Sequence, residues 1–95
     1  MIKIFKTTKE GLEETREIEK NCWINFYNPT NGELGKLSEK LNIPLDFLTD
    51  PLDVDERARI EMEDKCVLII LRIPHFDEKN LDIPYITLPI GIIFV

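Results

Sequence analysis

The residues of this chain best suited to chemistry are acidic and lie close together in the sequence. Seven carboxylates stand against two arginines between positions 50 and 64, and they are Asp50, Asp53, Asp55, Glu56, Glu61, Glu63 and Asp64. Carboxylates crowded in this way repel one another unless solvent, a basic neighbour or a cation offsets their charge. Hard cations such as Mg²⁺ bind carboxylate oxygens, keep most of their waters and need only one or two acidic side chains. The run therefore indicates either a solvated acidic surface or part of a magnesium site.

The sequence gives weaker signals for a calcium site, a phosphate-binding loop or a hydrolase site. The acidic run lacks the D-x-[DN]-x-[DN]-G pattern of an EF-hand, which argues against a dedicated Ca²⁺ site. Gly32 and Gly35 in "NGELGK" lack the strand and the terminal Lys-Ser/Thr of a phosphate-binding loop. His75 is the only histidine, and its neighbour Asp77 permits a pairing that a small hydrolase could use. We rank this hydrolase reading last and expect the chain to catalyse nothing.

Composition narrows the class of protein. The chain has 95 residues, a net charge of −6 and a pI near 4.7, which suits one soluble domain, or part of one, and works against a nucleic-acid partner. Cys22 and Cys66 have no metal-binding spacing and are expected to be small core residues. The longest apolar runs, Cys66–Leu71 and Pro89–Val95, fall short of the roughly 20 residues that a membrane-spanning helix needs.

Two strands and two helices are predicted in the first half. Alternation predicts a strand at Met1–Phe5, and bulky residues on both faces of "NCWINFYNP" predict a second strand that is covered on both sides. Thr30 and Glu33 have the spacing of a capping box, which opens a helix whose apolar face holds Leu34, Leu37 and Leu41 and which stops at Asn42. Pro44 begins a shorter helix from Leu45 to about Thr49, ended by Pro51.

Three further strands are predicted in the second half. Ala58, Ile60 and Met62 alternate with charged residues, as in a half-exposed strand. Cys66–Ile73 is apolar without alternation, which predicts a central strand buried on both faces, and "HFDEKNLDIP" is a polar connection. Tyr85–Val95 is a strand interrupted at Pro89 and Gly91, and its bare apolar ending suggests a fragment. We expect an α/β (α+β) fold, a mixed β-sheet with helices packed on its faces.

This order of elements resembles the amino-terminal cytoplasmic domain of the CorA family of magnesium and cobalt transporters. In that family a Trp-Ile-Asn/Asp strand leads through a helix to Pro-Leu-x-x-Leu-Glu-Asp, and an Arg-Pro-Lys-Val-Glu strand and a hydrophobic strand follow. The matching segments here are Trp23–Asn25, Pro44–Asp50, Arg57–Glu61 and Val67–Leu71. The resemblance covers roughly Asn21 to Phe76, and its strength lies in the combined order of these segments. Thr49, Pro51 and Ala58 depart from the family pattern, as expected of a divergent member.

The resemblance implies that residues 1–95 are part of a cytoplasmic αβα domain of a homopentameric transporter, on the cytoplasmic face of the membrane. The stalk helix, two membrane helices and Gly-Met-Asn motif of the family are missing from this sequence. Carboxylates from neighbouring subunits would share regulatory Mg²⁺, which favours the closed state. Asp50 matches the family's sensing aspartate, and Asp53 is a second candidate ligand. No organic cofactor is implied. The alternative is a free-standing soluble protein-interaction module with the same fold and no transport role.

Overall fold

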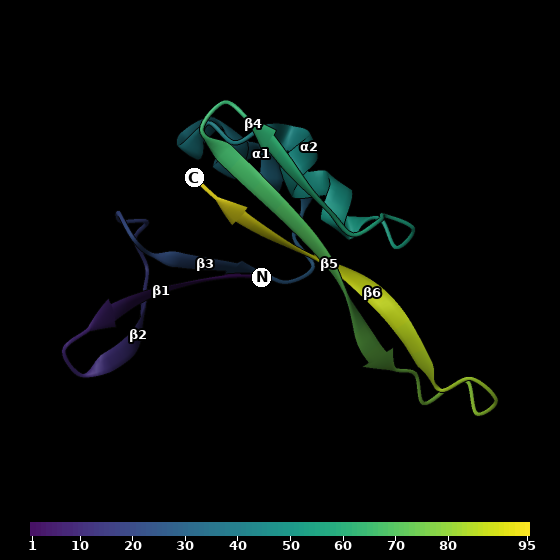
Figure 1. The fold of residues 1–95 in the computed structure, drawn as a ribbon. Helices are drawn as coiled ribbons and strands as arrows, with labels where there is room; N and C mark the ends of the chain where they lie inside the picture. Colours follow the sequence, from purple (N-terminus) through teal and green to yellow (C-terminus); the bar gives the residue numbers. More distant parts are fainter. The chain divides into compact units, whose positions relative to one another are not determined.

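Six strands form two separate antiparallel sheets, each in its own part of the chain (Figure 1). The computed structural model describes residues 1–95, which divide into the units Met1–Glu33 and Leu34–Val95. Helices and sheets in one chain confirm the predicted α+β class. Every strand pair is antiparallel, so two antiparallel sheets stand where one mixed sheet was expected.

The first unit is a small sheet in the strand order β2-β1-β3. Its strands are β1 (Ile2–Thr8), β2 (Gly11–Thr15) and β3 (Trp23–Phe26). β2 was not predicted, because its charged sequence carries no apolar alternation, yet it pairs with β1 through a turn closed by Gly11 at φ 114°. The side chain of Trp23 is 62% exposed, so the expectation that both faces of β3 are covered is wrong.

The first helix forms as its sequence signals predict. α1 (Asn31–Leu41) opens with a reciprocal capping box, in which the Glu33 backbone N–H donates to Thr30 Oγ1 at 3.1 Å and the Thr30 N–H donates to Glu33 Oε1 at 3.0 Å. It ends before Asn42, whose φ of 53° lies in the left-handed region that terminates helices.

A second, shorter helix follows. α2 (Leu45–Thr49) begins after Pro44 and is continued by a single 3-10 turn, η1 (Asp50–Leu52), which contains Pro51. Proline is tolerated there because the first turn of a helix leaves its N–H groups without partners. The predicted end of the α-helix at Thr49 is confirmed.

The second sheet has the strand order β4-β5-β6, with β5 paired on both sides as predicted for the central strand. Its strands are β4 (Arg59–Glu63), β5 (Cys66–Phe76) and β6 (Tyr85–Phe94). Alternate residues of β5 are buried and form the core together with residues of the two helices and their connection. The core consists of Leu34, Leu37, Ile43, Phe47, Leu48, Cys66, Leu68 and Ile70.

The opposite face of this sheet is apolar but exposed. Residues directly across antiparallel strands share a face, and the register places Ile60 beside Ile69 and Met62 beside Val67. Ile60 is 68% exposed and Met62 is 78% exposed. We call this surface the open face; its exposed apolar members are Ile60, Met62, Leu71, Ile73, Ile86, Ile90 and Phe94. The prediction that β5 is buried on both faces is therefore wrong.

β5 and β6 extend beyond β4 as a two-stranded arm, which Figure 1 shows running away from the helices. β5 continues to Phe76, three residues further than predicted, so His75 lies in a strand opposite Ile86 and not in a loop. No helix in the structure is both long enough and apolar enough to cross a membrane.

Gly91 of β6 is the point where η1 approaches the sheet most closely. A Cβ atom built on Gly91 would lie 2.7 Å from Pro51 Cβ and closer still to Pro51 Cγ. Only glycine leaves room for the proline ring, so η1 can rest directly on the sheet. This contact holds η1, whose first residue is Asp50, against β6.

Candidate functional site: a carboxylate cluster bound by an arginine

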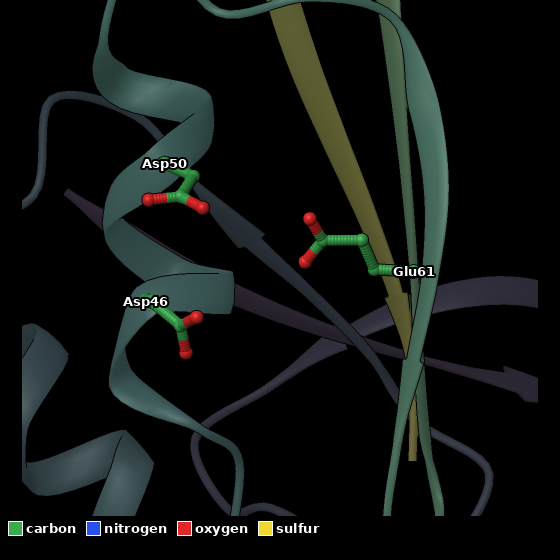
Figure 2. A group of neighbouring side chains, drawn as sticks. All are labelled: Asp46, Asp50 and Glu61. Carbon is green, nitrogen blue, oxygen red and sulfur yellow. The ribbon is translucent and has the colours of Figure 1, made fainter.

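Three carboxylates from three elements of the second unit, α2, η1 and β4, face one another (Figure 2). Asp46, Asp50 and Glu61 each offer an oxygen atom, and these oxygens lie within 4.8 Å of one another. Asp46 and Asp50 are four residues apart on consecutive helical turns, so their side chains project from the same side. Glu61 approaches from β4. We call these three residues the carboxylate cluster.

The cluster is bound by one guanidinium group. Arg59 Nη2 lies 3.0 Å from Asp50 Oδ2, and Arg59 Nε donates to Glu61 Oε1 at 2.8 Å. Arg59 Nη1 forms a further ion pair with Glu56. The Arg59 side chain is 26% exposed, so these ion pairs are partly shielded from water. One arginine thus offsets three carboxylates, two of which belong to the cluster.

The alternation of β4 explains why Arg59 and Glu61 meet Asp50. Both residues lie on the face of the sheet that carries the buried Leu68 and Ile70, because each is directly opposite one of them in the register. That face also receives η1. The charged side of β4 therefore points toward the helical segment, and its apolar side forms part of the open face.

Burial and neighbouring charges shift the pKa values at this site. Burial raises the pKa of Asp50 above its ordinary value of 3.8, Glu56 adds to the rise, and Arg59 partly opposes it. The hydrogen bond to Glu61 raises the pKa of Arg59, so its guanidinium stays charged. The ionised form of Asp50 is thus costly in this position despite its arginine partner.

A second arginine holds the backbone of the acidic segment that follows η1. Arg72 Nη1 donates to the carbonyl oxygens of Val54 at 3.0 Å and Glu56 at 2.7 Å. Its Nη2 and Nε donate to the carbonyl and hydroxyl oxygens of Thr87 on β6, at 2.9 Å and 3.0 Å. Arg72 thereby ties the acidic segment to the β5–β6 arm through carbonyl and hydroxyl oxygens, without contacting a carboxylate.

The two metal ligands predicted from the sequence lie in different surroundings. Asp50 is a member of the carboxylate cluster. Asp53 is exposed at the end of η1, where its Oδ1 accepts a hydrogen bond from the Asp55 N–H at 3.0 Å. Sequence reasoning missed Asp46, although its four-residue spacing from Asp50 within a predicted helix was a usable signal.

The other residues with chemical potential are placed elsewhere. His75 lies on the open-face side of β5, and the Asp77 carboxylate accepts a hydrogen bond from the Lys79 N–H at 3.1 Å. Cys22 and Cys66 are free thiols. Cys66 is buried, as predicted, and burial raises the pKa of its thiol, which keeps it protonated.

The donor set of the cluster suits a hydrated hard cation. All three groups are carboxylates, the ligands that Mg²⁺ favours. Ligands on opposite sides of an octahedral Mg²⁺ are about 4.2 Å apart, because each bond is about 2.1 Å long. Oxygens spread over up to 4.8 Å would therefore contact such an ion partly through its waters. Asp50 and Glu61 would be the residues that hold it, after their bonds to Arg59 are exchanged.

Comparisons with known proteins agree with the sequence resemblance. The family model described as CorA-like Mg2+ transporter protein matches residues 19–94. The cobalt/magnesium transport protein CorA of Methanocaldococcus jannaschii is 41% identical over 85 residues, which cover 82% of this chain and 27% of that protein. The complete structure of the CorA magnesium transporter from Methanocaldococcus jannaschii matches with a TM-score of 0.73 at 32% identity, over 97% of this chain and 29% of that one.

The chain thus spans less than a third of the length of the relatives it matches. The family match covers most of its residues and includes the acidic run, α2 and the β4-β5-β6 sheet. On these grounds the chain belongs to the CorA family of magnesium and cobalt transport proteins.

Proposed function

We propose that residues 1–95 form part of the cytoplasmic ion-sensing domain of a divalent-cation transporter. In this proposal the full-length protein is a homopentamer at the membrane, and this domain lies on the cytoplasmic face. Mg²⁺ bound where subunits meet favours the closed state. When the Mg²⁺ concentration falls, repulsion between the carboxylates favours opening.

The observation that carries the proposal is the position of Asp50. It lies in a group of three mutually close carboxylates, and the raised pKa of Asp50 reflects burial and the nearby Glu56. Such a site gains from an added cation, because a cation removes the cost of keeping several carboxylates ionised together. Family membership supplies the reason to expect that cation to be divalent.

In this proposal the two predicted ligands have unequal roles. Asp50 contributes the main carboxylate of the sensing site, Glu61 is a second ligand, and Asp46 adds negative charge beside them. Asp53 is a flanking ligand, whose exposed carboxylate can reach a cation only from outside the cluster. Because one or two carboxylates give Mg²⁺ only modest affinity, a partner carboxylate from a neighbouring subunit completes the site.

The proposal is tested by limited proteolysis of the full-length transporter over a range of Mg²⁺ concentrations. Mg²⁺ should protect the wild-type protein at millimolar concentration, because an ion that binds the closed assembly stabilises it by mass action. Asp50→Asn should weaken that protection, and Asp53→Asn should weaken it less. Asp55→Asn is the matched control, because it removes the same charge from the same run but outside the cluster.

Two outcomes decide the matter. Loss of protection in Asp50→Asn with normal protection in Asp55→Asn supports the sensing role. An unchanged Mg²⁺ dependence in Asp50→Asn would make Asp50 an ordinary surface carboxylate and would favour the alternative, a protein-interaction module without a transport role.

A further inference from the structure

The cation that already occupies the carboxylate cluster is part of the chain itself. Arg59 reaches Asp50 Oδ2 at 3.0 Å and Glu61 Oε1 at 2.8 Å, and both residues are members of the cluster. Arg59 is the only basic side chain that forms an ion pair with these residues. The acidic groups bonded to it are Asp50, Glu56 and Glu61, and Asp46 lies beside Asp50 and Glu61 in the cluster.

We propose that Arg59 is an internal counter-cation that competes with Mg²⁺ for Asp50 and Glu61, and so sets the Mg²⁺ concentration at which the site responds. This inference rests on the sensing role proposed above and names how that site is regulated. A divalent ion and a guanidinium repel each other, and both require the same carboxylate oxygens. Binding of Mg²⁺ at Asp50 therefore requires Arg59 to move aside.

The Arg59 side chain has partners outside the cluster to which it can remain bonded. Its Nη1 is bonded to Glu56, outside the cluster, and also lies 3.2 Å from the carbonyl oxygen of Arg57. A rotation of the partly exposed side chain can break the bonds to Asp50 and Glu61 and keep the bond to Glu56. Exchange with Mg²⁺ then needs a change of side-chain rotamer and leaves β4 and η1 in place.

Arg72 provides a matched control for the proposed competition between Arg59 and Mg²⁺. Arg59→Gln and Arg72→Gln remove the same charge from the surroundings of the same acidic segment. Arg72, however, donates to the carbonyl oxygens of Val54 and Glu56 and to Thr87, and to no carboxylate. An effect of net charge alone would be equal in the two variants, whereas competition for the cluster is confined to Arg59.

The experiment measures the Mg²⁺ concentration that gives half-maximal protease protection of the full-length transporter. We expect Arg59→Gln to lower that concentration about tenfold, a difference of about 1.4 kcal/mol in binding free energy. Arg72→Gln should leave it within about twofold of wild type. Arg59→Lys keeps a positive charge but lacks the forked donors that reach several carboxylates at once, so its midpoint should lie between those of wild type and Arg59→Gln.

A purely structural role for Arg59 would change the stability measured in excess chelator without lowering the Mg²⁺ midpoint, and that result overturns the inference. Equal midpoints for Arg59→Gln and Arg72→Gln overturn it as well. If Arg59→Gln fails to fold, a wild-type midpoint in Arg59→Lys is the overturning result.

The double variant Arg59→Gln with Asp50→Asn should not show the lowered Mg²⁺ midpoint of Arg59→Gln, because the carboxylate for which Arg59 competes has been removed. Failure of the sensing proposal is separate, because it appears as normal protection in Asp50→Asn alone.

Discussion

Asp50 is a carboxylate whose ionisation is opposed by folding. Burial and Glu56 raise its pKa above 3.8, so the folded chain holds this proton more tightly than the unfolded chain does. As the pH rises above 3.8, the unfolded chain ionises Asp50 first, and the free energy of unfolding falls until the folded-state pKa has been passed. The cost of ionised Asp50 is therefore present at neutral pH and is relieved in acid.

The Asp50→Asn variant of this chain should remove that pH-dependent loss. Relative to the variant, the wild-type chain should lose stability as the pH is raised from about 3.5 to 7, because only the wild-type chain carries the titrating group. Urea unfolding at several pH values measures the difference. A stability difference between wild type and Asp50→Asn that stays constant across this pH range would contradict the expectation.

Gly91 should tolerate no side chain, because the Pro51 ring occupies the space that a Cβ would need. The ring cannot swing away as the end of a flexible side chain could, so Gly91→Ala should cost about 1–3 kcal/mol, the range for an overpacked contact. Gly35→Ala is the control. Nothing lies within 4 Å of its added Cβ, and alanine favours the helical backbone of α1. In urea unfolding, Gly91→Ala should lower the free energy of unfolding and Gly35→Ala should raise it. Equal changes in the two variants would contradict the packing of η1 on β6.

The strand β5 has one core face and one open face, which neighbouring isoleucines can separate. Ile70 is 1% exposed, so Ile70→Ala should cost about 2–5 kcal/mol. Ile69 is half-buried on the open face, so Ile69→Ala should cost about 1 kcal/mol. Denaturant unfolding of the two variants provides the comparison. A larger loss at Ile69 than at Ile70 would reverse the assignment of the two faces.

Local signals in the sequence were sufficient to predict most elements. The capping box at Thr30 and the left-handed Asn42 depend only on neighbouring residues, so both ends of α1 were predictable. The apolar run after Cys66 is also a local signal, and it predicted the central strand. β2 escaped prediction because pairing with β1 and a turn at Gly11 form it, and neither leaves an apolar pattern.

The sequence did not determine which side of β4 faces the helices, and tertiary packing did. Alternation in β4 separates Ile60 and Met62 from Arg59 and Glu61, but it does not say which side faces the helices. In the structure the charged side does, because the ion pairs with Asp50 and Glu56 lie there. The resemblance pointed to Asp50, whereas the arrangement around it required the fold.

The open face should make the 95-residue chain associate with itself. Apolar surface of this extent on a folded chain favours association, because contact removes it from water. Sedimentation velocity over a range of concentrations should show species larger than a monomer. Replacing both Ile60 and Met62 by Lys should reduce association, since each side chain is more than two-thirds exposed and contributes little to the core. A wild-type chain that stays monomeric throughout would contradict this expectation.

The simple order of β4, β5 and β6 has a consequence for how the chain folds. Each strand pairs with the next one along the sequence, and only Asp64 and Lys65 separate β4 from β5. Such hairpins form within about 1–10 μs, because little loop entropy is lost when they close. Asp50 and Arg59 are nine residues apart in the sequence, and their ion pair joins η1 to β4. The β4–β5 hairpin can therefore form early, whereas the carboxylate cluster is completed only when β6 supplies Gly91, on which η1 rests.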